Sequence, residues 1–342
     1  MSKMQTIALD ALGGDFGPSV VVPAALSIAK AHPDLHLILV GMKDKIAQHL
    51  SAEQLSAQAN ISVHHASEEV GMDESAVLAL KRKKDSSMRV AIDLVKDAKA
   101  DACVSAGNTG ALMATAKFVL KTLPGISRPA ICGILPATGG HTYMLDLGAN
   151  VECSPEQLYQ FAVMGSMLAS AVDGIAKPRV GLLNIGSEAM KGNETVKAAN
   201  ELLAAGDLNY QGFIEGNDIF GDLVDVVVTD GFTGNISLKT MEGLAKMISQ
   251  FMREEFSRNV FTRLMAMIAL PVLKAFKNRI DPRLYNGASF LGLNGIVVKS
   301  HGGADQLAYE NAIRIAMLQV EQAVPSKISK HLDGLLNEKE VA

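Results

Sequence analysis

The chain has 342 residues, of which 48% are hydrophobic and 20% are charged, and this balance predicts a folded globular protein. The formal net charge of −4 argues against general nucleic-acid binding. The 3 cysteines share no metal-ligand or redox spacing, so we expect buried free thiols, a reducing cytoplasm and no metal. No apolar run reaches the ~18 residues of a membrane span, so any membrane contact is expected at the surface.

The first part of the chain alternates between strand and helix patterns. Strands are expected at residues 6–9, 35–40 and 61–65, with helical segments between them. This alternation is typical of a doubly wound, mostly parallel sheet covered by helices on both faces, a three-layer α/β/α sandwich. Asp10 and Asp15 follow the first strand, where they either face a ligand crevice or cap the next helix.

A strand, a turn of small residues and a helix follow one another between residues 102 and 120. The apolar run 102–104 predicts a buried strand, and the pattern of 111–120 predicts a buried helix. Amides at the start of a helix, together with its dipole, favour an anion. Since the spacing matches neither G-x-G-x-x-G nor the Walker loop, an ordinary tight connection remains the alternative. The residues predicted to bind phosphate are Ser105, Gly107, Asn108, Thr109 and Gly110.

The middle of the chain combines a hairpin with further strand-end turns. Strands 131–135 and 143–147 flank two glycines, which predict an antiparallel connection, and Asp146 lies near the end of the second strand. Strands are also expected at 180–185 and 224–229, each followed by a polar turn and a helix, the second helix starting at residue 236. The polar residues of these two turns are Lys191, Asn193, Asp230, Thr233 and Asn235.

We expect these turns and the turn after residue 104 to meet in one crevice, because ligands of open α/β sheets bind at the carboxyl ends of strands. Lys191 lies between glycines at such an end, although a surface lysine on a loop is the alternative. His301 follows the last expected strand, 295–300. A histidine there could act as a general acid or base, but a lone histidine is more often structural.

Residues 251–285 form a basic, amphipathic excursion from what is otherwise a single domain over residues 1–342. Pro271 is expected to split this segment into two short helices. One interpretation is a helix that packs on the core with one face and exposes the other face to solvent. The other, favoured because apolar residues extend beyond one stripe, is an element that binds an anionic membrane or an acidic protein. The cations expected to make this contact are Arg253, Arg258, Arg263, Lys274 and Lys277.

Several of these turns lie within longer motifs that together resemble the bacterial phosphate acyltransferase family. The motifs are IALDALGGDFGP at 7–18, KRKKDSSM at 81–88, VSAGNTGALMA at 104–114, MLDLGAN at 144–150, NIGSEAMKGNE at 184–194, VVVTDGFTGN at 226–235 and GIVVKSHGGAD at 295–305. The resemblance covers nearly the whole chain. It implies a fold related to phosphate acetyltransferases and isocitrate-dehydrogenase-like proteins, in a homodimer.

The resemblance also implies a reaction, acyl transfer from acyl-[acyl-carrier-protein] to inorganic phosphate, which gives acyl phosphate for phospholipid synthesis. We expect no cofactor, because the phosphate dianion is itself a nucleophile. The resemblance further implies that the enzyme attaches to the inner face of the cell membrane, where a membrane-bound glycerol-3-phosphate acyltransferase uses the product. It points to Lys191, which would neutralise developing charge, and to Asn235, which would donate to the phosphate or the oxyanion, as catalytic residues.

Two other functions remain as alternatives at this stage. A nucleotide-dependent dehydrogenase would use a similar sheet, but it predicts a glycine fingerprint after the first strand, and the turn DALGGDFG does not fit that pattern. A non-catalytic scaffold for lipid enzymes at the membrane surface would bind lipid without consuming a thioester.

Overall fold

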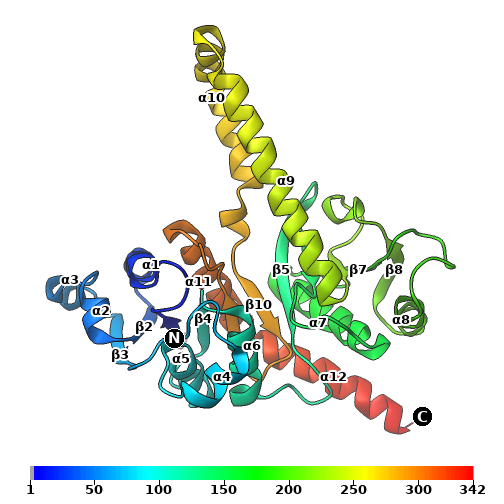
Figure 1. Ribbon diagram of the computed structural model, residues 1–342. Helices are drawn as coiled ribbons and strands as arrows, with labels where there is room; N and C mark the ends of the chain where they lie inside the picture. Colours follow the sequence, from blue (N-terminus) through cyan, green and yellow to red (C-terminus); the bar gives the residue numbers. More distant parts are fainter. Residues whose placement is uncertain (1–3, 342) are drawn as a thin grey trace.

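The computed structural model describes residues 4–341, which form an 11-stranded sheet with helices on both faces (Figure 1). The order across the sheet is β3-β2-β1-β4-β11-β10-β5-β6-β9-β7-β8. The strands are β1 (Gln5–Asp10), β2 (Leu35–Gly41), β3 (Ile61–His65), β4 (Ala102–Ser105), β5 (Ala130–Ala137), β6 (Gly140–Leu145), β7 (Arg179–Leu183), β8 (Asn209–Ile214), β9 (Val226–Val228), β10 (Ala288–Leu291) and β11 (Ile296–Lys299).

The helices alternate with these strands along most of the chain. They are α1 (Pro18–Ala31), α2 (Lys43–Ala47), α3 (Ala52–Ala57), α4 (Ala76–Arg82), α5 (Ser87–Lys96), α6 (Thr109–Leu120), α7 (Pro155–Asp173), α8 (Glu194–Ala204), α9 (Gly231–Ser257), α10 (Val260–Ile280), α11 (Gln306–Glu321) and α12 (Val324–Val341). Two short 3₁₀ turns are η1 (Asp218–Phe220) and η2 (Pro282–Tyr285).

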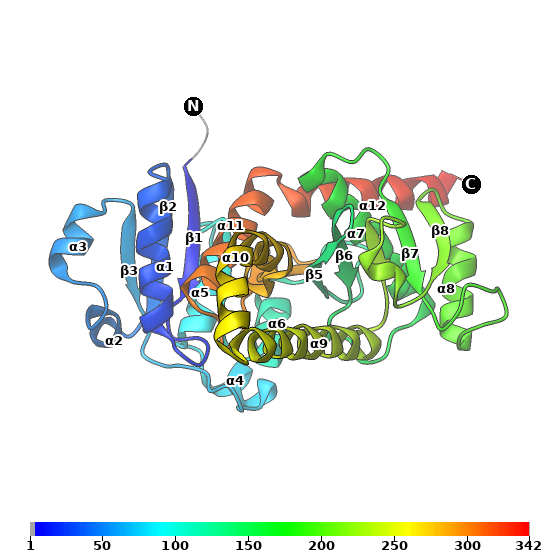
Figure 2. The same cartoon turned by 90° about the horizontal axis from the view of Figure 1, so that it is seen from above.

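The core lies in two layers, one on each face of the sheet. Alternate residues of a strand point to opposite faces, and in β1 Ala8 joins one core cluster while Ile7 and Leu9 join another. The first cluster packs against α5 and α6. The opposite face is covered by α1 and α11 over one half of the sheet and by α7, α8 and α12 over the other half (Figure 2). The predicted three-layer α/β/α sandwich is therefore confirmed.

The direction of the strands changes in the middle of the sheet. Seven of the ten neighbour pairings are parallel, but β10 pairs antiparallel with both β11 and β5, and β5 pairs antiparallel with β6. The predicted hairpin is confirmed as β5–β6. As a result β1, β4 and β11 run opposite to β6, β9 and β7, and their carboxyl ends form two groups rather than one common edge.

Helix α9 connects the two groups of strand ends. It begins directly after β9, and Figure 2 shows it crossing from the β7 half of the sheet toward the β1 half. Its Leu238 and Met241 pack against the core cluster that includes Ala111 and Leu112 of α6. The start of α9 therefore belongs to one group, and its next turns lie over the other.

Beyond the body, α9 and α10 form a helical hairpin that projects away from the sheet, which we call the arm (Figure 1). The prediction that Pro271 splits this segment was wrong, because α10 runs continuously through it. The two helices part at residue 259 instead, where Asn259 Oδ1 accepts a hydrogen bond from Thr262 N at 2.9 Å. This cap defines a new helix start, whereas an internal proline removes a single backbone bond.

Candidate functional site

The turns after β1, β4 and β11 pack against one another without room for side chains. A Cβ on Gly13 would lie 2.8 Å from Gly107 N, and one on Gly14, whose φ is +89°, would lie 2.9 Å from Gly302 O. The backbone N–H of Asp15 donates to Gly302 O at 2.9 Å. Glycine permits this close approach of backbone to backbone, so the three turns form one continuous surface.

At the centre of this surface lies the amino end of α6. Asn108 caps the helix, because its Oδ1 accepts a hydrogen bond from Ala111 N at 2.9 Å, while its Nδ2 donates to Met72 O at 2.6 Å and to Glu74 O at 3.1 Å. The Asn108 side chain is therefore fully occupied. Thr109 and Gly110 are exposed, and first-turn amides have no intrahelical partner. These two residues therefore offer N–H groups to an anion.

Beneath the turn lie Ser105 and Asp10, both fully buried. Ser105 Oγ donates to Asp10 Oδ2 at 2.6 Å and accepts from Gly107 N at 3.0 Å. Burial raises the pKa of the Asp10 carboxyl. Neither Asp10 nor Asp15 caps α1, whose N-cap is Gly17. Ser105 and Asp10 thus shape the turn from below, while Asp15 is exposed beside it.

In the second group, the turn after β6 is organised around Asp146. Its buried carboxylate accepts hydrogen bonds from Ile131 N at 2.9 Å, Ala149 N at 3.1 Å and Asn150 N at 2.7 Å. Asn150 Nδ2 adds another at 2.9 Å. Burial raises the pKa of this carboxyl, and the hydrogen bonds oppose that shift. Asp146 therefore holds a turn together instead of facing a ligand.

The start of α9 fits tightly against this turn. A Cβ on Gly234 would lie only 1.9 Å from Asp146 O, and one on Gly148 would lie 3.4 Å from Asn235 Cβ. The Asn235 side chain lies beside Gly148 and is exposed. The close approaches at Gly234 and Gly148 fix the helix turn that carries this exposed side chain.

Asp230 and Thr233 are hydrogen-bonded to each other at the start of α9. Asp230 is the N-cap of α9 and accepts hydrogen bonds from Thr233 N at 2.7 Å and from Thr233 Oγ1 at 3.0 Å. Their polar groups are therefore engaged in capping, which leaves Asn235 as the free polar side chain among the predicted residues of this turn.

Lys191 and Asn193 lie on a third turn, after β7. Asn184 closes this turn by donating from Nδ2 to Gly186 O at 3.1 Å and to Lys191 O at 3.2 Å. Asn193 caps α8 by accepting from Val196 N at 2.8 Å. Lys191 is exposed, and within residues 4–341 no hydrogen bond joins its ammonium to Asn235 or to the α6 turn. The structure thus assigns Asn184 a holding role that the sequence analysis did not predict.

Lys299, at the end of β11, was also missed. It is buried, and its Nζ donates to Ala106 O at 3.2 Å and to Ser300 O. Burial lowers the pKa of Lys299 to about 8; Lys239 of α9 adds to the shift, while Asp10 and Asp15 oppose it. The available signal was a lysine inside the apolar run GIVVKS, where a charge is unexpected.

His301 lies next to this lysine. Its backbone N–H donates to Asn286 Oδ1 at 3.0 Å, and its Nδ1 accepts from Gly303 N at 3.1 Å. Burial lowers the pKa of His301, and nearby Lys239 lowers it further. The ring is therefore hydrogen-bonded to the backbone, and its lowered pKa favours the neutral form, which leaves the role of His301 as a prediction.

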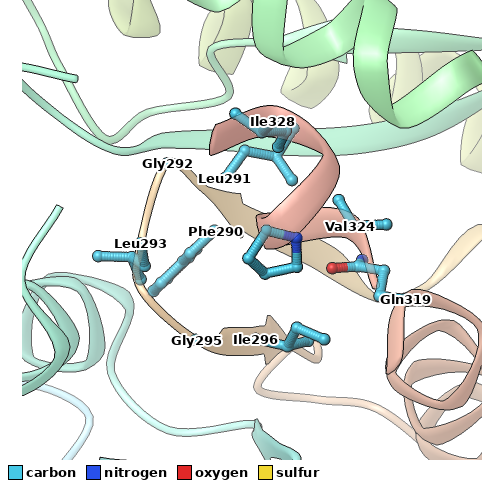
Figure 3. A pocket seen from close by; sticks show the side chains of 10 residues that line it. Phe290, Leu291, Gly292, Leu293, Gly295, Ile296, Gln319, Val324 and Ile328 are labelled. Carbon is cyan, nitrogen blue, oxygen red and sulfur yellow. The ribbon is translucent and has the colours of Figure 1, made fainter. Parts of the chain in front are cut away.

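Two small cavities among the described residues lie away from these turns. One, of about 10 Å³, lies between the β10–β11 connection and the start of α12 (Figure 3). The other, of about 20 Å³, is lined by residues that include Cys132 and Tyr143. Such volumes hold about one water each. Neither cavity accommodates an acyl chain, so the strand-end turns remain the candidate site.

The overall fold is similar to that of phosphotransacetylases. A phosphotransacetylase from Streptococcus pyogenes superposes with a TM-score of 0.63 at 18% identity, covering 94% of this chain and 95% of that one. A 4-hydroxythreonine-4-phosphate dehydrogenase from Klebsiella pneumoniae gives a TM-score of 0.52 at 15% identity, covering 93% and 100%. At these identities the likeness establishes a shared fold.

Sequence relatives define the family more narrowly. A family model described as fatty acid synthesis protein matches residues 5–327. Phosphate acyltransferases from Nitrosococcus oceani and Methylococcus capsulatus are 58% and 59% identical, covering 98% and 99% of this chain and 99% and 100% of those relatives. The chain therefore belongs to the phosphate acyltransferase family. Neither a dehydrogenase nor a non-catalytic scaffold is favoured by these relatives.

Proposed function

We propose that this enzyme transfers a fatty acyl group from acyl-[acyl-carrier-protein] to inorganic phosphate and releases acyl phosphate for phospholipid synthesis. The observation that carries the proposal is the exposed amino end of α6, at Thr109 and Gly110, above a buried cation. An anion is stabilised at such a helix end, and the curated relatives are phosphate acyltransferases.

In the proposed reaction, an oxygen of the phosphate dianion attacks the thioester carbonyl. A C–O bond forms, the carbonyl oxygen becomes an oxyanion, and its collapse breaks the C–S bond, so that the carrier leaves as a thiolate and takes up a proton. The chain needs only to position phosphate and stabilise charge. Asn235 would donate to the phosphate or the oxyanion, and Lys191 would neutralise developing charge.

The cysteines have no part in this mechanism. Burial raises the pKa of the Cys103 and Cys132 thiols, and it raises the pKa of Cys153 to about 12. Since the thiolate is the reactive form, these side chains are poor nucleophiles. The direct attack of phosphate is supported by this absence of an activated thiol among the described cysteines.

The test is release of thiol from acyl-[acyl-carrier-protein] with and without phosphate. We expect phosphate-dependent release by the wild-type enzyme and a loss of about a hundredfold in kcat for both Lys191→Ala and Asn235→Ala, the scale of one lost oxyanion donor. Lys197→Ala is the matched control, because Lys197 is on the neighbouring helix α8 and pairs with exposed Glu194. Turnover that is independent of phosphate, or near wild-type in both site variants, would contradict the proposal.

We further propose that the arm attaches the enzyme to an anionic membrane and that the enzyme works as a homodimer. Every residue of α10 is at least partly exposed, including Val260 at 82% and Ile268 at 76%. The cations proposed to face the lipid headgroups, with the carrier protein as the alternative partner, are Arg253, Arg258, Arg263, Lys274 and Lys277. None of the helices within residues 4–341 has both the length and the apolar content to cross a bilayer.

Vesicle sedimentation tests the membrane contact. We expect binding to phosphatidylglycerol vesicles that weakens with salt and is absent with phosphatidylcholine. Arg263→Glu and Lys274→Glu should weaken it, whereas Lys117→Glu on α6 should not. Equal binding of all variants would reject the arm as the contact, and light scattering of the enzyme in solution tests the dimer.

A further inference from the structure

A chain of hydrogen bonds connects a buried cation to a buried carboxylate through the backbone of the α6 turn. Lys299 Nζ donates to Ala106 O at 3.2 Å, the adjoining Gly107 N donates to Ser105 Oγ at 3.0 Å, and Ser105 Oγ donates to Asp10 Oδ2 at 2.6 Å. These five residues come from the ends of β11, β4 and β1 and from the turn after β4. The sequence analysis named Asp10, Ser105 and Gly107 as candidates, whereas it did not name Lys299 or Ala106.

Asp10 and Lys299 are both buried, and the negative charge of Asp10 opposes the lowering of the Lys299 pKa. An isolated charge in the interior is costly, and a buried pair is tolerated when each partner compensates the other. Asp10 Oδ1 has no hydrogen-bond partner among the described residues. Ser105, Ser87 and the backbone at Leu12 and Gly13 oppose the rise in the Asp10 pKa, and Asp10 in turn favours the charged form of Lys299. The intervening peptide, between residues 106 and 107, is held from both ends.

The turn has little freedom to adopt another shape. A Cβ on Gly107 would lie 2.6 Å from Met88 Cε and 3.2 Å from Ser105 Oγ. The residues that follow are the cap Asn108 and the exposed Thr109 and Gly110. Any rotation of the peptide at 106–107 would therefore redirect the first amides of α6.

We propose that Lys299 is a positioning residue for phosphate: it fixes the peptide at 106–107 so that the α6 amides face the anion, and it places a buried positive charge beneath that anion. This inference rests on the proposed function, because it assigns the phosphate subsite to the α6 turn. Lys299 acts through Ala106 and through its charge, without touching the reacting atoms.

The charge of Lys299 gives the proposal a pH signature. The groups that face it are Asp10 and Asp15 from the β1 side, Lys239 from α9, and His301 beyond the end of β11. Burial lowers the pKa of Lys299 to about 8. A bound dianion favours the protonated form, so phosphate must bind more weakly as pH rises through that value and the free enzyme loses the proton.

The experiment compares Lys299→Met and Lys299→Arg with the surface control Lys117→Met. We measure kcat and the KM for phosphate in carrier-thiol release from about pH 6.5 to about pH 9.5. For Lys299→Met we expect a KM at neutral pH raised about tenfold or more, the scale of one charge-assisted hydrogen bond, with the rise near pH 8 abolished. Lys299→Arg should keep a lower KM than Lys299→Met and move the rise to higher pH, because guanidinium stays charged.

A wild-type KM in Lys299→Met, or an unchanged pH profile in Lys299→Arg, would overturn the inference. Thermal unfolding will show whether Lys299→Met folds. If it does not fold, the pH dependence of the KM for phosphate in Lys299→Arg still tests the inference. Titration calorimetry with inorganic phosphate separates this inference from the proposed function. If the wild-type enzyme releases no thiol, the function fails, whereas equal phosphate affinity in wild type and both Lys299 variants refutes the role of Lys299.

Discussion

Gly234→Ala should separate the start of α9 from the turn that supports it. A Cβ there would lie 1.9 Å from Asp146 O, and contacts under 3.0 Å essentially do not occur, so the two must move apart by more than an ångström. Asp146 O belongs to the backbone and the position of a Cβ is fixed by its own backbone, so neither atom can rotate away. The displaced residue next in the chain is Asn235, which the proposed mechanism requires in place.

The magnitude follows from two opposing effects. Overpacking costs about 1–3 kcal/mol, and more when the contact is rigid, whereas alanine favours a helix over glycine by up to about 1 kcal/mol. We expect a net loss of about 2 kcal/mol in the free energy of unfolding, since the added Cβ meets a rigid backbone carbonyl. For a chain of 342 residues this corresponds to a Tm lower by roughly 3 °C, and an ångström of misplacement should lower kcat by about a hundredfold.

Gly243→Ala on the same helix is the matched control. Nothing lies within 4 Å of a Cβ at that position, so the substitution should raise stability by about 0.5–1 kcal/mol and leave turnover unchanged. Thermal unfolding and phosphate-dependent thiol release are measured for both variants. If Gly234→Ala behaves like Gly243→Ala in both assays, the close approach of α9 to the Asp146 turn is not a constraint, and our account of how Asn235 is placed is wrong.

Three further predictions concern other hydrogen bonds of the fold. Asn108→Ala removes the α6 cap and should lower the unfolding free energy in urea by about 1–2 kcal/mol; no loss would contradict the capping role. Asn184→Ala should lower kcat with little change in Tm, because the Lys191 turn is exposed; unaltered turnover would count against it. Protonated His141 donates a hydrogen bond to Asp173, which raises the pKa of His141, so the pair stabilises the fold below about pH 6.5 and this contribution fades as pH rises past the raised pKa. Asp173→Asn should therefore destabilise the protein more at low pH than at high pH in urea unfolding, and a pH-independent difference would refute the coupling.

Local sequence patterns determined most of the individual elements. Buried strands such as β4 are continuous apolar runs, because a strand covered on both faces needs no polar side. Helix α7 begins with a complete capping box at Ser154 and a proline at its first position, both of which are local sequence signals for a helix start. The glycine-rich turns predicted an anion site at α6. Strands β8 and β10 were missed, since the first includes Gly212 and a half-exposed pattern, and the second has only four residues.

Tertiary structure alone decided how the turns are grouped. The expectation of one crevice assumed a single parallel edge, but the antiparallel strands β5 and β10 reverse the direction between the two halves of the sheet. Strand pairing is set by contacts between residues far apart in sequence, which short-range periodicity does not report. For the same reason the burial of Lys299 beside Asp10 could not be predicted: each is a single charge at the end of its own strand, and only the pairing of β11, β4 and β1 brings them together.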